Sequence, residues 1–365
     1  MKVQFLNFEP MHSAIKSNMD LAFKRVYDSH WFIQGRELGE FERLYSELNC
    51  VQHTVGVSNG LDALVLSLRV LGVGVGDEVI VPSNTYIATA LAVSQVGSTP
   101  VFVEPCIDTY NLDPLLIEAA ITSKTKAIMP VHIYGQACEM DVIIQIAQKH
   151  GLFIVEDNAQ AHLSSFNGKL TGTFGHVNGT SFYPGKNLGA LGDAGAITTN
   201  DDELANRLRM LRNYGSAKKY YNEEIGYNNR LDELQAAFLS VKLNYIQQWT
   251  AQRKEIASVY NELLKDVEGL ILPKCHEHAD HVYHLYVIRS KNRIELQNFL
   301  LENGVQTMIH YPVPPHLQQA YKYLGYKPGD FPIAEEIADT CLSLPIWPGM
   351  KNSDVEYISD LIKEM

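Results

Sequence analysis

The chain has 365 residues, of which 46% are hydrophobic and 20% charged, and its formal net charge at pH 7 is −12. Such a composition is typical of a globular protein with one large and one smaller domain. The acidic balance and the lack of a long basic run argue against nucleic acid as a partner.

The cysteines and the N-terminus indicate where the protein works. Five cysteines are scattered along the chain without a CxxC pair, which predicts reduced thiols in a cytoplasmic protein. The first ten residues include Glu9 and lack the apolar core of a signal peptide. Since no stretch approaches about 18 uninterrupted apolar residues, we expect no membrane span.

The first half of the chain predicts two helices followed by alternating strands and helices. Helices at Met11–Tyr27 and Glu37–Leu48 flank a loop at Ser29–Gly35. Strands are then predicted at Thr54–Val57, Glu78–Val81, Pro100–Val103, Ala127–Val131, Leu152–Val155, Thr180–Phe182 and Ala196–Thr199. Helices between them are predicted at Leu61–Leu71, Ile87–Val96, Pro114–Ile121 and Val142–His150. Repeated β-α-β order predicts an α/β fold with a mostly parallel central sheet covered by helices.

The second half predicts a different arrangement. Helices are expected at Asp201–Leu211, Leu231–Lys242 and Leu243–Lys265, followed by Tyr283–Ile288, a helix at Arg293–Leu301, an extended Thr307–His310 and a last helix from Asp354. This order is typical of a small α+β domain. We therefore predict a large domain over residues 1–245 and a small C-terminal domain over residues 246–365.

Lys186 and Asp157 form the most informative pair of residues. Lys186 lies in a turn with Gly185 and Gly189, directly after a predicted strand, and Asp157 follows the apolar strand Leu152–Val155. Open α/β sheets bind ligands at the carboxyl ends of their strands, so both side chains should face one crevice. A lysine amine binds the aldehyde of pyridoxal 5'-phosphate (PLP), and a carboxylate keeps its ring nitrogen protonated. This chemistry is favoured over a surface lysine and a helix-capping aspartate.

A phosphate site is predicted close to this pair. Residues 56–64 follow a strand and open a helix, where free backbone N–H groups and the helix dipole suit a phosphate. Taken alone, the segment favours a turn with an N-cap. The presence of Lys186 and Asp157 favours the phosphate, and Ser181 offers an additional hydroxyl.

Three further patterns each allow two interpretations. Tyr86, after the strand Glu78–Val81, either stacks on a flat cofactor ring or lies in the core. Asn228, before a predicted helix, either caps that helix or recognises phosphate. The proline-rich segment from His310 to His316 either lines a substrate mouth or connects domains.

Two other motifs are assigned to structure. The glycines between Gly72 and Asp77 precede a strand, whereas a dinucleotide-binding loop follows one, so a turn is predicted there. His276, His278, His281 and His284 make a zinc site conceivable. Because the segment lacks paired cysteines and an HExxH pattern, a solvated loop followed by core packing is favoured.

Together these motifs resemble the DegT/DnrJ/EryC1/StrS family, the PLP-dependent nucleotide-sugar aminotransferases of the aspartate aminotransferase-like fold (fold type I). The resemblance covers nearly the whole chain. It includes the segment Trp31–Gly35, SNGLDAL from Ser58, VEDNAQAH from Val155, SFYPGKNLGALGDAGA from Ser181, LRNYGS from Leu211, GYNNRLDELQAAFL from Gly226 and HYPVPPH from His310.

The resemblance implies a role for each candidate cofactor-binding residue. Lys186 binds the cofactor covalently and moves the substrate proton, Asp157 pairs with the pyridine nitrogen, and Gln160 approaches the ring hydroxyl. Tyr86 lies beside the ring. The residues that contact the phosphate are Gly60, Leu61 and Ser181.

The resemblance also implies partners. Asn228 reaches the phosphate of the neighbouring subunit, which implies a homodimer with shared active sites. Tyr183, His310 and His316 lie near the nucleotide sugar. No metal, nucleic acid or membrane is expected.

At three positions, the residue in this chain can be compared with residues that differ between members of the family. Many members have Thr where this chain has Leu61, which leaves only backbone N–H groups for that phosphate contact. Many have Ala or Cys where this chain has Asn158. Relatives that dehydrate sugars have a histidine at the position of Lys186, so the lysine favours amino transfer.

The expected reaction moves the amino group of L-glutamate to C3 of a dTDP-linked 3-keto-6-deoxyhexose. Such enzymes make Fuc3N or Qui3N precursors for surface glycans such as lipopolysaccharide O-antigen and S-layer glycan. The alternatives are a C4 aminotransferase acting on dTDP-4-keto-6-deoxyglucose, a PLP-dependent sugar dehydratase, and a regulator that binds PLP without turnover.

Overall fold

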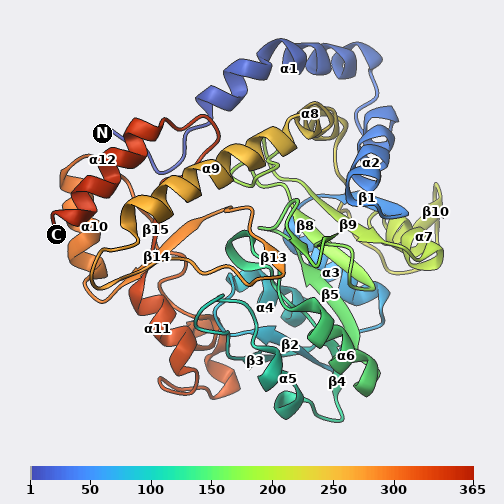
Figure 1. The fold of residues 1–365 in the computed structure, drawn as a ribbon. Helices are drawn as coiled ribbons and strands as arrows, with labels where there is room; N and C mark the ends of the chain where they lie inside the picture. Colours follow the sequence, from blue (N-terminus) through green and yellow to red (C-terminus); the bar gives the residue numbers. More distant parts are fainter. Residues whose placement is uncertain (1) are drawn as a thin grey trace.

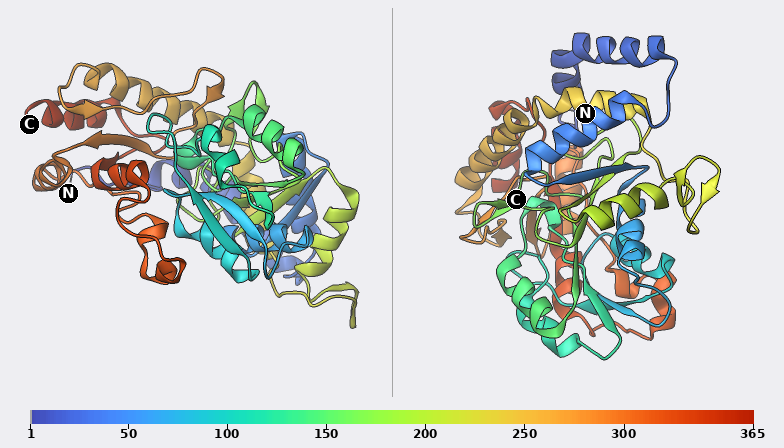
Figure 2. Two further views of the ribbon diagram at one scale, coloured as in Figure 1. Left: turned by 90° about the horizontal axis from the view of Figure 1, so that it is seen from below. Right: turned by 90° about the vertical axis from the view of Figure 1, so that its right-hand side faces the viewer.

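The computed structural model describes residues 2–365. Two helices come first, α1 (Glu9–Ser29) and α2 (Arg36–Asn49), close to their predicted bounds. Helix α1 projects from the body of the molecule and packs on α8 (Glu233–Leu243), as Figures 1 and 2 show.

A seven-stranded sheet forms the centre of the molecule, in the order β1-β9-β8-β5-β4-β2-β3. Its strands are β1 (His53–Val57), β2 (Glu78–Pro82), β3 (Thr99–Val103), β4 (Thr125–Ile128), β5 (Phe153–Asp157), β8 (Val177–Ser181) and β9 (Gly195–Thr199). Strand β9 runs antiparallel to β1 and β8, whereas β3, β2, β4, β5 and β8 are parallel to one another. The predicted α/β fold with a mostly parallel sheet is confirmed.

Helices cover both faces of this sheet (Figure 1). They are α3 (Gly60–Val70), α4 (Ile87–Gln95), α5 (Pro114–Ala120), α6 (Met140–His150) and α7 (Asp202–Leu211). In β2, Val79 and Val81 pack into the cluster that contains α3 and α4, whereas Ile80 packs with α5 and α6 on the other face. Alternate side chains of a strand point to opposite faces, so this strand is apolar throughout because both faces are buried.

The C-terminal part forms a second, smaller sheet. Helix α9 (Ile246–Leu264) leads to the sheet β12-β14-β15, whose strands are Leu270–Ile271, Tyr286–Ser290 and Cys341–Leu344. Helices α10 (Arg293–Glu302), α11 (Pro332–Thr340) and α12 (Asn352–Lys363) complete this part. Strand β15 and helix α11 were not predicted. The predicted extended Thr307–His310 forms no strand and contributes one isolated bridge, from Met308 to Ser343.

The first residues of the chain pack with this C-terminal part. Val3 forms a parallel bridge with Val305 and belongs to the apolar cluster that contains α9, α10 and α12. The N-terminal segment is therefore joined to the C-terminal part, although the predicted domain boundary assigns it to the large domain. The division at residue 245 itself stays a prediction.

Two smaller sheets accompany these two larger ones. Strands β6 (Ser165–Phe166), β7 (Lys169–Leu170) and β13 (Ala279–Asp280) form one small sheet, and β10 (Ser216–Lys218) and β11 (Tyr221–Asn222) form a projecting hairpin (Figures 1 and 2). Across residues 2–365, no helix is both long enough and apolar enough to span a membrane.

Candidate active site

A cavity of about 1030 Å³ lies beside the carboxyl ends of β5 and β8. Residues from the beginning of α3, from the loop after β2, from the turn after β8 and from the C-terminal part line it. Among the predicted site residues, the lining includes Gly60, Leu61, Tyr86, Asp157, Gln160, Ser181, Tyr183, Lys186 and His310. The fold thus brings together side chains that are more than 200 residues apart in the chain.

The parallel register of β5 and β8 brings the two catalytic candidates to one edge of the sheet. Asp157 is the last residue of β5 and pairs with Gly179 of β8. Two residues later β8 ends at Ser181, and the chain turns, with the Lys186 N–H donating to the Tyr183 carbonyl at 2.8 Å. Lys186 therefore returns to the crevice that Asp157 faces, as expected for an open α/β sheet.

The Lys186 amine is prepared to act as a nucleophile. Burial lowers the pKa of Lys186 to about 8, and the nearby Asp157 carboxylate partly opposes this effect. No hydrogen bond from its Nζ is found among residues 2–365. A lysine with a lowered pKa has a larger neutral fraction near pH 7, and the neutral amine is the form that attacks an aldehyde.

Asp157 is a buried carboxylate with neutral partners. Its Oδ2 accepts from the Thr89 hydroxyl at 2.8 Å, and its Oδ1 accepts from the Ala159 N–H at 3.1 Å. Burial raises the pKa of Asp157, although the Thr89 and Ala159 hydrogen bonds and the charge of Lys186 act in the opposite direction. A cation or a protonated ring nitrogen in the cavity would offset the cost of burying this charge.

A chain of hydrogen bonds fixes Gln160. Its Oε1 accepts from the Tyr134 N–H at 2.6 Å, and its Nε2 donates to the Tyr311 hydroxyl at 3.0 Å. The Tyr311 ring lies 5.1 Å from the ring of Tyr86, centre to centre. Tyr86 remains 54% exposed at the cavity, so the interpretation that places this residue in the core is wrong.

The N-terminus of α3 forms a narrow cradle against β8. The Asn59 side chain caps the helix by accepting from the Asp62 N–H at 2.8 Å. A Cβ added to Gly60 would lie 2.5 Å from Cβ of Ser181, so only glycine allows this close approach. The N-cap interpretation of this segment is therefore correct, and it coexists with a helix N-terminus that faces the cavity and suits a phosphate.

Two predicted site residues lie away from this cavity. His316 is buried between Phe331, whose ring centre is 4.7 Å away, and Glu335, whose carboxylate lies 3.1 Å from Nε2. The structure therefore gives no support to a contact between His316 and a substrate in this cavity. Asn228 bridges Asn213 beyond α7 and is absent from the cavity lining, so within one chain it does not meet the cofactor-binding candidates.

Three residues that sequence reasoning did not assign to the site also line the cavity: Tyr311, Arg253 and His284. His284 was assigned to core packing. Burial and several nearby basic groups, Lys186 first among them, lower the pKa of His284 well below its ordinary value, so its ring is neutral at pH 7. Its apolar neighbours in the sequence gave no signal that His284 would line the cavity.

The histidine-rich segment does not form a metal centre. Within the described part of the chain, no group of three or more His, Cys, Asp or Glu side chains converges to hold a metal ion. His276 is 3.9 Å from Glu139, and His281 stacks on Tyr283 with ring centres 4.1 Å apart.

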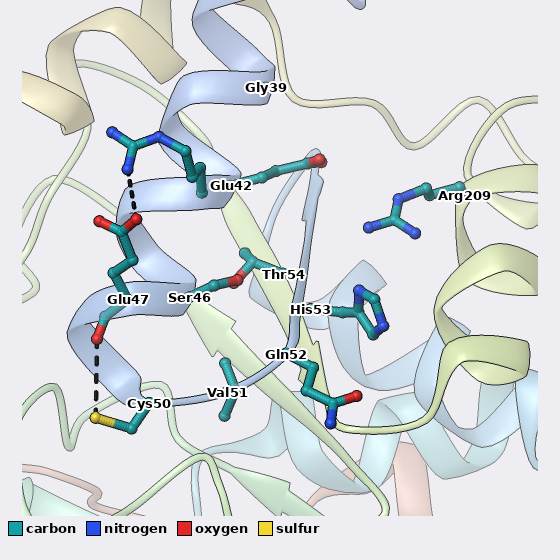
Figure 3. Close-up of a pocket in the computed structure, with 11 residues that line it drawn as sticks. Gly39, Glu42, Ser46, Glu47, Cys50, Val51, Gln52, His53, Thr54 and Arg209 are labelled. Carbon is teal, nitrogen blue, oxygen red and sulfur yellow. Dashed lines mark hydrogen bonds and ion pairs between the residues drawn. The ribbon is translucent and has the colours of Figure 1, made fainter.

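A separate hollow of about 420 Å³ lies where α2 turns into β1 (Figure 3). Its charged side chains already have partners, because Arg43 pairs with Glu47 at 2.5 Å and His53 lies 2.6 Å from Asp202. None of the predicted site residues lines this hollow. The larger cavity is therefore the candidate active site.

The groups in the larger cavity fit PLP. Lys186 offers an amine for the aldehyde, Asp157 a buried carboxylate for the ring nitrogen, and the cradle at Gly60 and Ser181 backbone N–H and hydroxyl groups for the phosphate. This donor set matches the three polar ends of the cofactor. The assignment of individual contacts to these residues stays a prediction.

Known proteins resemble this chain over its full length. Residues 13–363 match the DegT/DnrJ/EryC1/StrS aminotransferase family. A dTDP-3-amino-3,6-dideoxy-alpha-D-galactopyranose transaminase from Aneurinibacillus thermoaerophilus is 51% identical, with 99% of this chain and 98% of that protein covered. The erythromycin biosynthesis sensory transduction protein EryC1 from Saccharopolyspora erythraea is 49% identical, with 100% and 99% covered.

Solved structures agree with the fold. A crystal structure of DesV from S. venezuelae, in complex with a ketimine intermediate, has a TM-score of 0.98 and 46% identity, with 99% of this chain and 98% of that chain covered. NtdA from Bacillus subtilis, with bound cofactor PMP, has a TM-score of 0.89 and 30% identity, with 100% and 86% covered. The predicted fold type is thus confirmed.

The lowered pKa of Lys186 predicts how cofactor capture depends on pH. The rate at which the cofactor-free protein captures PLP should rise with pH and level off above about 8, because deprotonation gives the reactive amine. In Asp157→Asn the midpoint should move to lower pH, because the carboxylate that raises the lysine pKa is gone. Stopped-flow absorbance measures the rate. A midpoint near the ordinary lysine value of about 10.4 would contradict this prediction.

The narrow cradle predicts a selective effect of Gly60→Ala. The added methyl group would force α3 away from Ser181, so PLP affinity should fall about tenfold or more, which is about 1.4 kcal/mol. Gly39→Ala is the matched control, since nothing lies within 4 Å of the added Cβ. Absorbance titration of both cofactor-free variants tests this; equal affinities for PLP would show that the cradle does not hold the cofactor.

Proposed function

The chain belongs to the DegT/DnrJ/EryC1/StrS aminotransferase family, and we propose that it transfers the amino group of L-glutamate to C3 of a dTDP-linked 3-keto-6-deoxyhexose. As a member of this family it is a PLP-dependent aminotransferase. The observation that carries the amino-transfer proposal is that the half-buried Lys186 amine, with its lowered pKa, lines the same cavity as the buried Asp157 carboxylate.

The side chains of the cavity can be assigned roles in this reaction. When bound, PLP supplies an electron-accepting ring that carries the amino group between the two substrates. The neutral Lys186 amine takes the proton from the α-carbon of the donor and later delivers a proton to C3 of the sugar. Such general acid–base help is worth about 10²–10⁴-fold in rate. Asp157 would keep a proton on the ring nitrogen.

Relatives support the choice of C3. The transaminase from A. thermoaerophilus is named for a 3-amino-3,6-dideoxy sugar carried on dTDP, and it is 51% identical to this chain over nearly its whole length. A cavity of about 1030 Å³ is also large enough for part of a nucleotide sugar beside the cofactor. The name of this relative supports a dTDP-linked 3-keto substrate over a 4-keto one, and the cavity volume is compatible with either.

Two alternatives to amino transfer are a sugar dehydratase and a PLP-binding regulator. By family resemblance, a dehydratase has a histidine at the position of Lys186, and a histidine cannot form the covalent link to the PLP aldehyde. A regulator has support from the name of EryC1, a sensory transduction protein, but a protein that only senses PLP has no need of a lysine whose lowered pKa suits proton transfer. The cavity groups therefore favour turnover.

A paired assay tests the proposal. The enzyme with PLP and L-glutamate is incubated with dTDP-3-keto-6-deoxyhexose in one vessel and dTDP-4-keto-6-deoxyglucose in the other, and amino sugar is detected by mass. Product is expected from the 3-keto substrate, and Lys186→Ala should reduce it by at least about 10⁴-fold while leaving the fold intact. Product from the 4-keto substrate alone would move the enzyme to the C4 class. Absence of amino sugar in both vessels would favour a regulator.

We also propose that the enzyme is a homodimer with shared active sites. Asn228 does not line the cavity of its own chain. Large apolar side chains are exposed along α1 and the segment after it, including Leu21, Phe23, Tyr27 and Trp31. Monomers rarely expose apolar side chains in such a concentration, so a partner subunit is the expected cover.

Mixing two inactive variants tests the shared site. In a heterodimer of Lys186→Ala and Asn228→Ala, one site would contain Lys186 from one chain and Asn228 from the other, so subunit exchange should restore activity to a fraction of the wild type. A mixture of Lys186→Ala and Asp157→Ala is the control and should stay inactive, because both residues belong to the same chain's site. If the first mixture also stays inactive after exchange is verified, Asn228 does not act across subunits.

Two further proposals concern the cell. The five cysteines are free, which supports work in the reducing cytoplasm. The product would enter surface glycans such as O-antigen or S-layer glycan. Cell fractionation and the sugar composition of surface glycans in a strain without the gene test these two statements.

A further inference from the structure

Three arginines of the described chain are buried: Arg212, Arg253 and Arg289. Arg212 pairs with Glu42 at 2.5 Å, and Arg289 pairs with Glu336 at 2.8 Å. Arg253 is 2% exposed, and no carboxylate pairs with it among residues 2–365. It is thus a buried cation whose counter-charge does not come from its own chain.

Arg253 projects from α9 to the wall of the active-site cavity. Its Nη1 donates to the carbonyl oxygens of Tyr283, His284 and Ile346 at 3.2, 3.3 and 3.2 Å. In the same part of the chain, neither Nε nor Nη2 makes a hydrogen bond. One edge of the guanidinium is therefore held by the backbone, and the other edge has no partner.

The guanidinium remains charged under physiological conditions. Burial lowers the pKa of Arg253 to about 10, so the side chain is protonated at pH 7. An unpaired buried charge is strongly unfavourable, and buried ions in proteins are normally paired. The cavity that Arg253 faces is where the missing anion must come from.

The basic groups around Arg253 make this side of the cavity suitable for an anion. Lys186 and Arg253 line the same cavity, and Arg253 also donates to the carbonyl oxygen of His284, another lining residue. Asp157 already accepts hydrogen bonds from Thr89 and Ala159. An anion near Arg253 would therefore be drawn to the same region as the reacting carbon.

We propose that Arg253 binds a carboxylate of the amino donor through the free edge of its guanidinium. A planar carboxylate matches the two parallel N–H groups of such an edge. In L-glutamate the α-carboxylate is attached to the carbon that gives up the amino group, so it necessarily lies close to Lys186. This inference rests on the proposed function and adds the determinant of donor recognition to it.

Two other anions of the reaction fit this position less well. The cofactor phosphate has its own cradle at Gly60 and Ser181. The diphosphate of a nucleotide sugar is attached at C1 and so is separated from C3 by part of the sugar ring. Since Arg253 is enclosed, a small carboxylate on the reacting carbon is favoured over a diphosphate that leads out to the nucleotide.

The test compares the two half-reactions of the PLP-loaded enzyme. Variants Arg253→Lys and Arg253→Met are made, with Arg289→Lys as the matched control, because Arg289 is equally buried but lies outside the cavity lining. Rapid-mixing absorbance gives the affinity and rate for L-glutamate, and separately those for the keto sugar. Binding of 2-methylglutamate, which has no α-proton to lose, is titrated as a measurement independent of turnover.

We expect Arg253→Lys to weaken binding of glutamate and 2-methylglutamate about tenfold and Arg253→Met about 100-fold, as for a lost charge-assisted hydrogen-bond pair. The keto-sugar half-reaction should change less than about threefold, and the control should match the wild type. Isoglutamine and glutamine, which lack the α- and γ-carboxylate charge respectively, identify the carboxylate. If Arg253 binds the α-carboxylate, isoglutamine should bind to Arg253→Met almost as tightly as glutamate does. If it binds the γ-carboxylate, the same should hold for glutamine.

Other results would overturn the inference. Unchanged binding of 2-methylglutamate in a folded Arg253→Lys variant would mean that Arg253 is only a backbone clamp. A loss confined to the keto-sugar half-reaction would assign it to the diphosphate. Should Arg253→Met not fold, Arg253→Lys and the amide comparison on the wild type still decide the question. A wild-type enzyme that does not accept glutamate at all would overturn the proposed donor together with this inference.

Discussion

The structure depends on one electrostatic constraint, the placement of a half-buried lysine amine and a buried carboxylate in the same cavity. Burial disfavours the charged form of each group, which lowers the pKa of Lys186 and raises that of Asp157. Their mutual attraction only partly offsets this cost. The parallel sheet makes the arrangement possible, because strands β5 and β8 end side by side and hold both side chains on a rigid edge.

The remaining polar groups of the cavity include neutral side chains and unpaired hydrogen-bond donors. Gln160 donates a hydrogen bond to the Tyr311 hydroxyl. Burial lowers the pKa values of His284 and His310, so both rings are neutral at pH 7. The helix N-terminus at Gly60 and the guanidinium of Arg253 face the same space. A cavity that combines a helix N-terminus with the basic side chains Lys186 and Arg253 is suited to ligands that bring phosphate and carboxylate charges.

The sequence predicted the sheet and the catalytic pair because both depend on local signals. Apolar runs between helices marked the strands, and Asp157 and Lys186 each follow such a run. His316 was expected near the sugar from the family resemblance, yet the chain turns after His310 and buries His316 against Phe331. Arg253 looked like any polar position of a long helix, and only packing of α9 against the loops at His284 and Ile346 reveals its role.

The central claim is that Asp157 determines the protonation of the cofactor ring nitrogen, while Lys186 takes the proton from the donor α-carbon and delivers one to C3 of the sugar. The most direct test is the ¹⁵N chemical shift of ring-labelled PLP bound to the wild type and to Asp157→Asn. The account predicts a protonated ring nitrogen in the wild type at neutral pH and an unprotonated one in the variant. A ring nitrogen in the same protonation state in both proteins would contradict it.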